Sequence, residues 1–201
     1  MYTKTTYYPE NLISPARYKE ISPRGTLLSL GIDSGDICAD IGCGNGFFTL
    51  PMADIVGPSG LVYAVDIETD MLDSLKKRIR NEQSRIIIPM KSTSSAIPLS
   101  EHSITKEFLS MVLHEADHPD RLLNECLRIL AKRGSLFILE WAYRETAHGP
   151  DIEKRISLEN INQWLAGTTA SLVSSTAITA SHMLYHIEKG GKDDSSAAQN
   201  R

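Results

Sequence analysis

A glycine-rich turn behind an acidic side chain is the part of this sequence in which residue types and spacing point most directly to chemistry. Residues 40–46 read Asp-Ile-Gly-Cys-Gly-Asn-Gly, so three glycines alternate behind an aspartate. Glycine tolerates positive φ angles and lets the backbone approach a ligand closely. The spacing after the turn predicts a helix, whose first N–H groups have no intrahelical partners. The segment is therefore a candidate ligand-binding loop.

Two classes of nucleotide cofactor suit such a loop, and the spacing separates them. A dinucleotide site has the pattern G-x-G-x-x-G, but Phe47 stands where the third glycine would be. Asp40 would repel a pyrophosphate and attract the ammonium group of S-adenosylmethionine. Asp66 ends the next apolar run, where a carboxylate can accept two ribose hydroxyls in either cofactor. The pattern favours S-adenosylmethionine over NAD. The structural alternatives are a helix-capping role for Asp40 and a surface role for Asp66.

The elements that must position these residues alternate along the chain. Apolar runs predict strands at residues 36–41, 61–67, 85–90, 104–113, 135–141, 171–178 and 182–188. Helical spacing is expected at residues 14–30 with a break at Pro23, at 47–55, 69–81, 119–130 and 157–165. Ser14, Thr69 and Ser157 are the expected caps of three of these helices.

This alternation predicts an α/β fold of the Rossmann-like, doubly wound type. Strands that alternate with helices form a parallel sheet with helices on both faces. The last two strands follow each other without a helix, so we expect them to form an antiparallel hairpin at one edge of a seven-stranded, mostly parallel sheet. Ligands of such sheets bind beyond the carboxyl ends of the strands, where the glycine turn and Asp66 are expected.

Several segments resemble one known family. Residues 37–53 and 62–72 are similar to motif I and the segment after it in class I S-adenosylmethionine-dependent methyltransferases. Residues 112–119 and 123–141 resemble the later part of the same family, and the ubiquinone/menaquinone-biosynthesis-like branch of small-molecule methyltransferases is the most similar. The resemblance implies a methyltransferase that uses S-adenosylmethionine, releases S-adenosylhomocysteine and acts on a small-molecule acceptor.

The resemblance also implies which residues contact the cofactor. The glycine turn would surround the methionine part together with the end of the fourth strand. The acid that ends the second strand would hold the ribose, and residues after the second and third strands would contact the adenine. The implied contact residues are Asp40, Gly42, Gly44, Asn45, Gly46, Asp66, Ile67, Met71, Thr93, Ser94, Ser110 and Met111.

Two departures from the family pattern leave a second hypothesis open. Thr93 stands where the family often has an aspartate that accepts from the adenine amino group, and Thr105 stands where it often has one at the start of strand four. A catalytically silent member would bind S-adenosylmethionine or S-adenosylhomocysteine and serve as a regulatory or interaction module. A nicotinamide oxidoreductase is a third hypothesis, which Phe47 disfavours.

Methyl transfer needs positioning and, for some acceptors, a base. The cofactor already carries the activated methyl group, so the protein mainly supplies proximity. Histidine is the first candidate for a base because its ordinary pKa is close to neutrality. His114 follows the fourth strand at the rim where an acceptor would lie. A capping or loop-packing role is the alternative for this histidine.

Composition excludes several other classes. The net charge of −4 and the absence of a basic stripe argue against a nucleic-acid partner. Cys38, Cys43 and Cys126 form no CxxC pair, so we expect reduced thiols, a cytoplasmic location and no metal site. The sequence has no run of about 18 apolar residues and no apolar leader, so no membrane span is expected.

The 201 residues suit a single domain. We expect this domain to cover residues 1–189, with residues 1–30 as an N-terminal helical segment in which Tyr2, Tyr7 and Tyr8 could form a lid. The small polar residues 190–201 predict a disordered tail. The acceptor, the methylated atom and the oligomeric state stay open at this point.

Overall fold

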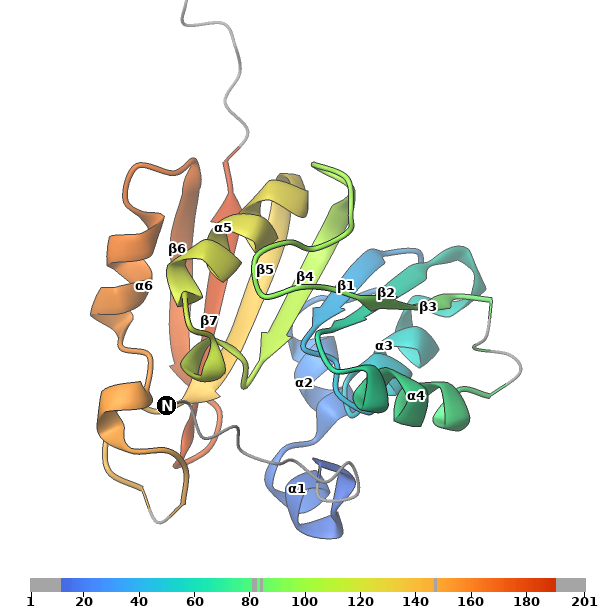
Figure 1. Cartoon of the computed structure of the whole chain (residues 1–201), viewed down its shortest axis with the longest axis horizontal. Helices are drawn as coiled ribbons and strands as arrows, with labels where there is room; N and C mark the ends of the chain where they lie inside the picture. Colours follow the sequence, from blue (N-terminus) through green and yellow to red (C-terminus); the bar gives the residue numbers. More distant parts are fainter. Residues whose placement is uncertain (1–11, 81–82, 84, 147, 191–201) are drawn as a thin grey trace, which may run out of the picture.

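A seven-stranded sheet forms the centre of the protein. The computed structural model describes residues 12–80, 83, 85–146 and 148–190. The strand order is β3-β2-β1-β4-β5-β7-β6 (Figure 1). The strands are β1 (Ile37–Ile41), β2 (Leu61–Asp66), β3 (Ile87–Lys91), β4 (Ile104–Ser110), β5 (Leu130–Trp141), β6 (Ala170–Ala177) and β7 (His182–Lys189). Strands β1 to β5 are parallel, and β7 runs antiparallel to both β5 and β6. The predicted fold class and edge hairpin are therefore confirmed.

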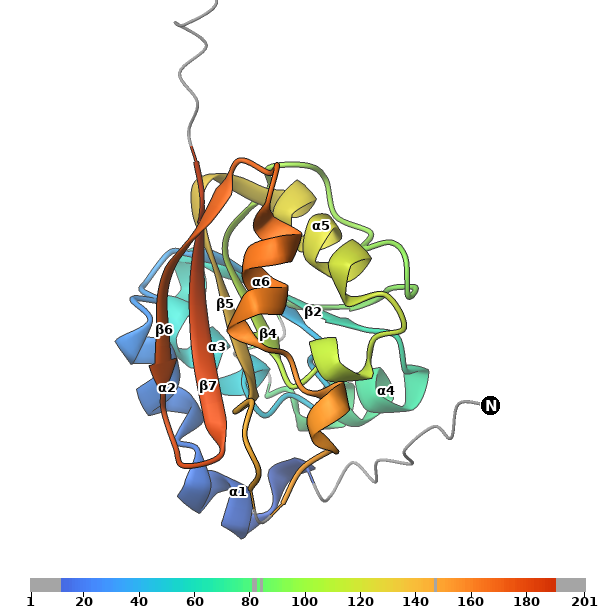
Figure 2. The same cartoon turned by 90° about the vertical axis from the view of Figure 1, so that its left-hand side faces the viewer.

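Helices cover both faces of this sheet. They are α1 (Pro15–Glu20), α2 (Pro23–Ser29), α3 (Thr49–Val56), α4 (Thr69–Arg78), α5 (Pro119–Ile129) and α6 (Leu158–Leu165), with short 3-10 turns η2 (Gly57–Ser59), η3 (Leu113–Glu115) and η4 (Ile152–Lys154). Buried residues of α2, α3 and α4 belong to one apolar cluster, and those of α5 and α6 belong to another. Figure 2 shows α5 and α6 on the side of the sheet opposite α2.

Side chains of successive residues in the central strands pack alternately in the two apolar clusters. Cys38 of β1 packs in the cluster that contains Met52 of α3, whereas Ala39 packs in the cluster that contains Leu123 of α5. All four side chains are buried. This two-sided burial explains why the central strands read as nearly continuous apolar runs.

Local sequence signals define several helix starts as predicted. Ser14 Oγ accepts from Arg17 N at 3.4 Å, with Pro15 in the first turn of α1. Ser157 caps α6, and its hydroxyl accepts from Asn160 N at 3.1 Å. The prediction for Thr69 was wrong: Glu68 is the N-cap of α4, and Thr69 is the first helical residue.

Two strand boundaries differ from the prediction. Strand β4 ends at Ser110 rather than Leu113, because Met111 has a φ of 60° and takes the chain out of the extended conformation. Strand β5 begins at Leu130 rather than at residue 135, and its pairing with β4 shifts register where Arg133 adopts a φ of 62°. Apolar periodicity cannot reveal such changes of backbone conformation.

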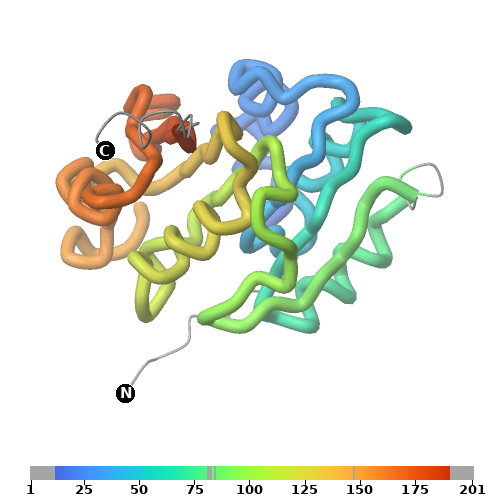
Figure 3. Tube along the Cα trace, turned by 90° about the horizontal axis from the view of Figure 1, so that it is seen from above, coloured from blue at the N-terminus to red at the C-terminus, as the bar shows by residue number. Residues whose placement is uncertain are grey.

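The connection between β3 and β4 has no helix. Residues 92–103 run as a loop that passes beside α5 (Figure 3). The tyrosines of the expected lid and residues 191–201 of the expected tail lie outside the described residues. Within the described part of the chain, no helix is both long enough and apolar enough to cross a membrane.

Candidate functional site

The predicted ligand-binding residues converge at the carboxyl edge of the parallel strands. The glycine turn follows β1, and its Gly42 and Cys43 N–H groups both donate to Val65 O of β2, at 2.8 and 3.0 Å. Ser110 ends β4, the strand that pairs with β1 on its other side. These backbone bonds place the turn between the ends of β2 and β4.

Asp66 joins the second strand to the glycine turn. Its Oδ2 accepts from Gly44 N at 2.8 Å, and its Oδ1 accepts from Glu68 N at 2.8 Å. Burial raises the pKa of this carboxyl above its ordinary value. The two bonds hold the carboxylate at the turn. Each oxygen of a carboxylate can accept more than one hydrogen bond, so this arrangement remains compatible with ribose hydroxyls.

Asp40 is a buried acid at the end of β1. Only 2% of its surface is exposed, and its Oδ2 accepts from Thr49 Oγ1 at 2.6 Å. Burial raises the pKa of Asp40 to about 7 despite this hydrogen bond. Burial disfavours the ionised form of this carboxyl, and a cation bound next to it would stabilise that form. The environment of Asp40 therefore suits an ammonium group.

Two of the three glycines of the turn have no room for a side chain. Gly42 has a φ of 71°, and a Cβ there would lie 2.2 Å from Val112 Cγ2. Gly46 has a φ of 89°, and its Cβ would lie 2.5 Å from Leu75 Cδ1. Packing within the protein therefore requires glycine at both positions, in addition to any need for close approach by a ligand.

The end of β4 presents an unsatisfied polar atom. Ser110 Oγ is buried and has no hydrogen-bond partner among the described residues. Buried hydroxyls normally find a partner in the protein or in a bound molecule. Met111 follows it in a left-handed conformation, which turns the chain across the strand ends.

The residues expected at the adenine lie further along the same edge. Ile67, just beyond β2, is 52% exposed, whereas Met71 of α4 is buried. Thr93 and Ser94 are exposed in the loop after β3. This loop begins next to Asp66, since Ser92 N donates to Asp66 O at 3.0 Å.

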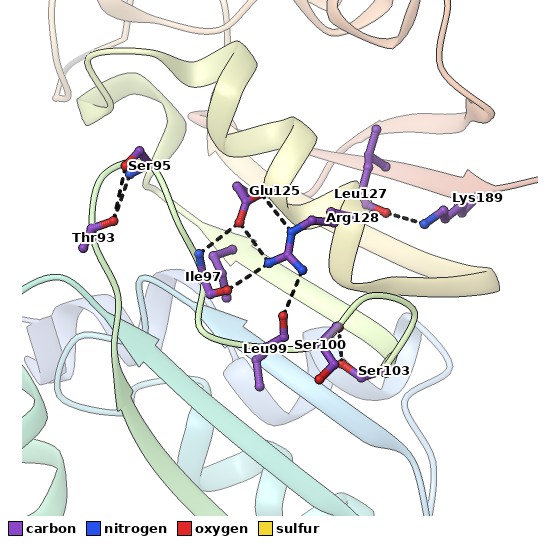
Figure 4. A network of polar contacts seen from close by, with 10 residues as sticks. All are labelled: Thr93, Ser95, Ile97, Leu99, Ser100, Ser103, Glu125, Leu127, Arg128 and Lys189. Carbon is purple, nitrogen blue, oxygen red and sulfur yellow. Dashed lines mark hydrogen bonds and ion pairs between the residues drawn. The ribbon is translucent and has the colours of Figure 1, made fainter.

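A side-chain network on α5 fixes the far part of the loop after β3 (Figure 4). Arg128 donates to Ile97 O and Leu99 O, both at 2.9 Å. Glu125 accepts from Ile97 N at 3.1 Å and forms an ion pair with Arg128 at 2.9 Å. This network therefore anchors the loop to α5.

Thr105, the second departure from the family pattern, lies at the opposite edge of the sheet. Its hydroxyl accepts from Ile37 N at 3.2 Å and donates to Ile37 O at 3.0 Å, at the amino end of β1. The residue therefore joins β4 to β1 and does not contact the glycine turn.

His114 forms a buried pair with Glu140. The distance from His114 Nδ1 to Glu140 Oε2 is 2.7 Å, and the two side chains are 6% and 0% exposed. Glu140 also accepts from the backbone N–H groups of His114 and Trp141, both at 3.3 Å. Because this carboxylate acts as an acceptor, the imidazole proton resides on Nδ1, and Nε2 is left as the basic atom. Nε2 lies 3.6 Å from Glu115 Oε1.

A hollow of about 270 Å³ opens beside this pair. Its walls come from η3, η4, the start of α5 and α6, and they include His114, Lys154, Ile156 and Trp164. Trp141, at the end of β5, lies against Gly149 and His182 rather than in the wall of this hollow.

Comparisons with known proteins agree with this geometry. Residues 39–138 match the family model described as a methyltransferase domain. The chain is 32% identical over 112 residues to the demethylmenaquinone methyltransferase of Lactobacillus johnsonii, a stretch that covers 55% of this chain and 46% of the relative. It is 30% identical over 118 residues to the ubiquinone/menaquinone biosynthesis C-methyltransferase UbiE of Chromobacterium violaceum, covering 58% of this chain and 48% of the relative. The chain contains a class I S-adenosylmethionine-dependent methyltransferase domain.

The fold of this methyltransferase domain recurs in solved structures. The crystal structure of a SAM dependent methyltransferase from Aquifex aeolicus superposes with a TM-score of 0.83 at 22% identity, covering 92% of this chain and 100% of that chain. The predicted family and its quinone-biosynthesis branch are confirmed. The chain spans about half the length of the curated relatives that it matches.

The residues at the carboxyl edge of the methyltransferase domain fit its cofactor. S-adenosylmethionine carries an ammonium group, which suits the buried Asp40, and a ribose, which suits Asp66. At the end of β4, Ser110 adds a buried hydroxyl that has no hydrogen-bond partner in the described part of the chain. The predicted contact residues therefore present complementary chemistry along one edge of the sheet.

Sequence reasoning missed the partner of His114. Glu140 lies 26 residues further along the chain, and only the parallel pairing of β4 with β5 brings the two together. The signal that could have found it is a charged residue at the end of an otherwise apolar run, since such acids are seldom buried without a partner.

Proposed function

We propose that this chain transfers a methyl group from S-adenosylmethionine to a small-molecule acceptor of the quinol type, with His114 as the general base and Glu140 as its positioning residue. The observation that carries the proposal is the buried 2.7 Å hydrogen bond between these two side chains. His114 lies two residues after Val112, whose side chain covers Gly42 of the cofactor turn. The names of the relatives support the acceptor class.

We infer that the cofactor is held along the strand ends. Asp40 would bind the ammonium group, and Asp66 the ribose hydroxyls. The remaining contacts would come from Gly42, Gly44, Asn45, Gly46, Ile67, Met71, Thr93, Ser94, Ser110 and Met111. When bound, the cofactor supplies a methyl group already activated on a sulfonium.

The chemical step that remains for the protein is to remove a proton from the acceptor. A quinol ring carbon becomes a stronger nucleophile when a ring hydroxyl loses its proton. His114 Nε2 would accept this proton, and Glu140 would stabilise the imidazolium that results. The ring carbon that takes the methyl group then loses its own hydrogen as a proton, and a proton returns to the ring oxygen, which restores the aromatic quinol and leaves one net proton on His114. The hollow beside the pair supplies an aromatic wall, Trp164, and a cationic side chain, Lys154, which suit a flat ring with a developing negative charge.

Single-turnover transfer of a labelled methyl group to a demethylated naphthoquinol tests this proposal. We expect His114→Ala to lower the rate by roughly 10²–10⁴-fold, the usual contribution of a general base. Glu140→Gln should lower it in the same direction. His118→Ala is the matched control, because His118 is exposed at the start of α5 and makes no side-chain cap.

Three outcomes would separate the alternatives. A His114→Ala rate within about threefold of wild type would remove His114 from the chemistry but leave the methyltransferase function standing. Tight S-adenosylhomocysteine binding without transfer to any acceptor would favour the catalytically silent module. Transfer to acceptors other than quinols would overturn the acceptor class alone. The cytoplasmic location and the lack of a nucleic-acid partner stay predictions.

A further inference from the structure

Helix α1 lies at the same edge of the sheet as the glycine turn (Figure 1). None of its own residues is buried. Two of its side chains instead meet Phe47, the residue that directly follows the turn. The Arg17 guanidinium lies 4.4 Å from the centre of the Phe47 ring, and the Tyr18 ring lies 4.7 Å from it. These contacts place a cationic side chain beside the cofactor turn.

A second contact fixes the position of Arg17. Its Nη1 donates to Leu12 O at 3.0 Å. Leu12 in turn covers the turn, because its Cδ1 lies 3.2 Å from where a Cβ of Gly44 would be. Arg17 is therefore held beside Phe47 at the end of the glycine turn and, through Leu12, close to its middle.

The charge of Arg17 acts on the buried acid of the site. Burial raises the pKa of Asp40, and the positive charge of Arg17 opposes this rise. The same charge contributes to lowering the pKa of His182 at the start of β7. Arg17 thus lies close enough to the end of β1 and to the start of β7 for its charge to act on both, on the side of the site where the methionine part would bind.

The methionine part of the cofactor carries two opposite charges. Its ammonium group suits Asp40, but its carboxylate needs a cation or N–H donors close by. Arginine suits a carboxylate best, because its planar guanidinium donates two parallel hydrogen bonds. Arg17 supplies a guanidinium beside the glycine turn, and its charge reaches Asp40, the acid that would bind the ammonium group.

We propose that Arg17 of α1 binds the carboxylate of the methionine part of S-adenosylmethionine. This inference rests on the proposed function. With this contact, α1 becomes a part of the cofactor site, because the bound carboxylate lies between Arg17 of the helix and the glycine turn. The sequence gives no sign of this role, because Arg17 lies outside every segment that resembles the family motifs.

Two ligands that differ only in the carboxylate test the proposal. Calorimetric titration would measure the affinities of S-adenosylmethionine and decarboxylated S-adenosylmethionine. We expect Arg17→Ala to weaken binding of the first by about tenfold or more, as the loss of a charge-assisted bond does, and of the second by less than about threefold. Arg17→Lys should recover part of the affinity. Lys19→Ala, an exposed neighbour on α1, is the control and should change neither.

The outcomes distinguish this proposal from the proposed function. Equal weakening of both ligands by Arg17→Ala would show that Arg17 only holds α1 in place, and it would overturn this proposal alone. Unchanged affinity for both ligands would overturn it as well. If the wild-type protein bound neither ligand, the proposed function would fail together with it. Melting temperatures of the variants would exclude unfolding as the cause.

Discussion

Asp40 is deeply buried, and this burial makes ligand binding sensitive to pH. Burial raises the pKa of its carboxyl to about 7, so the acid is largely protonated below neutral pH in the free protein. An ammonium group of the ligand prefers the ionised form. Binding below pH 7 must therefore release a proton from Asp40, and this opposes binding.

We expect the affinity for S-adenosylhomocysteine to fall by roughly tenfold or more between pH 7.5 and pH 5.5, since each unit below the pKa costs about tenfold. Calorimetry in buffers of different ionisation enthalpy would detect the released proton. Asp40→Asn should bind more weakly at pH 7.5 and lose most of the pH dependence. A slope that persists in Asp40→Asn would assign the proton to another group, such as Asp66, whose pKa burial also raises.

At the residue scale, the sequence predicts the acids and glycines of the site but not its long-range partners. Asp40 and Asp66 stand at the ends of apolar runs, and such ends meet at one edge of a parallel sheet. The bond between His114 and Glu140 joins residues on different elements. Arg17 reaches Phe47 across a helix, a strand and a turn. No spacing rule covers such pairs.

At the scale of elements, the glycine turn packs against the segment that follows β4 in addition to forming a candidate ligand loop. Val112 of the segment after β4 fills the space over Gly42, so any side chain at this position would push that segment away. The same segment leads to His114. The conformation of the turn and the position of the base are thus physically coupled.

Gly42→Ala and Gly31→Ala separate steric clash from backbone strain. Both glycines have positive φ angles, 71° and 68°, but a Cβ on Gly31 meets no described residue within 4 Å. We expect Gly31→Ala to lower the free energy of unfolding by about 1–2 kcal/mol, the strain of a left-handed alanine. Gly42→Ala should lower it by about 2–5 kcal/mol, because overpacking adds to that strain. Urea denaturation measures both, and equal losses would contradict the clash with Val112.

Element boundaries show where local signals suffice. Ser14 with Pro15 marks the start of α1, and Ser157 marks the start of α6, since capping depends on residues that are neighbours in the sequence. The end of β4 depends instead on the left-handed Met111, a conformation that methionine seldom adopts without tertiary support. The prediction therefore failed at the strand end that turns the chain toward the candidate base.

At the scale of the whole molecule, the cofactor site draws on elements from both halves of the sheet. Strands β1 and β2 lead to the glycine turn and to Asp66, the proposed ribose ligand, and β4 and β5 lead to Ser110 and to the proposed base His114 with its partner Glu140. Apolar periodicity was sufficient to predict the parallel sheet and its antiparallel edge. It also left no helix between the third and fourth strands, and residues 92–103 do cross as a loop. It could not predict the side-chain bonds through which Glu125 and Arg128 anchor that loop, because these residues belong to a later element.

Because these contacts exist only in the folded chain, a ligand that bridges them should stabilise the whole molecule. We expect S-adenosylhomocysteine at about 100 times its dissociation constant to raise the free energy of unfolding by roughly 2.7 kcal/mol. For a domain of this length the melting temperature should rise by about 5–10 °C. NADH at the same concentration should produce no shift, since Phe47 replaces the glycine of a dinucleotide turn and the buried Asp40 opposes a pyrophosphate. Differential scanning fluorimetry with both ligands makes the comparison, and a shift with NADH alone would contradict the assignment of the cofactor.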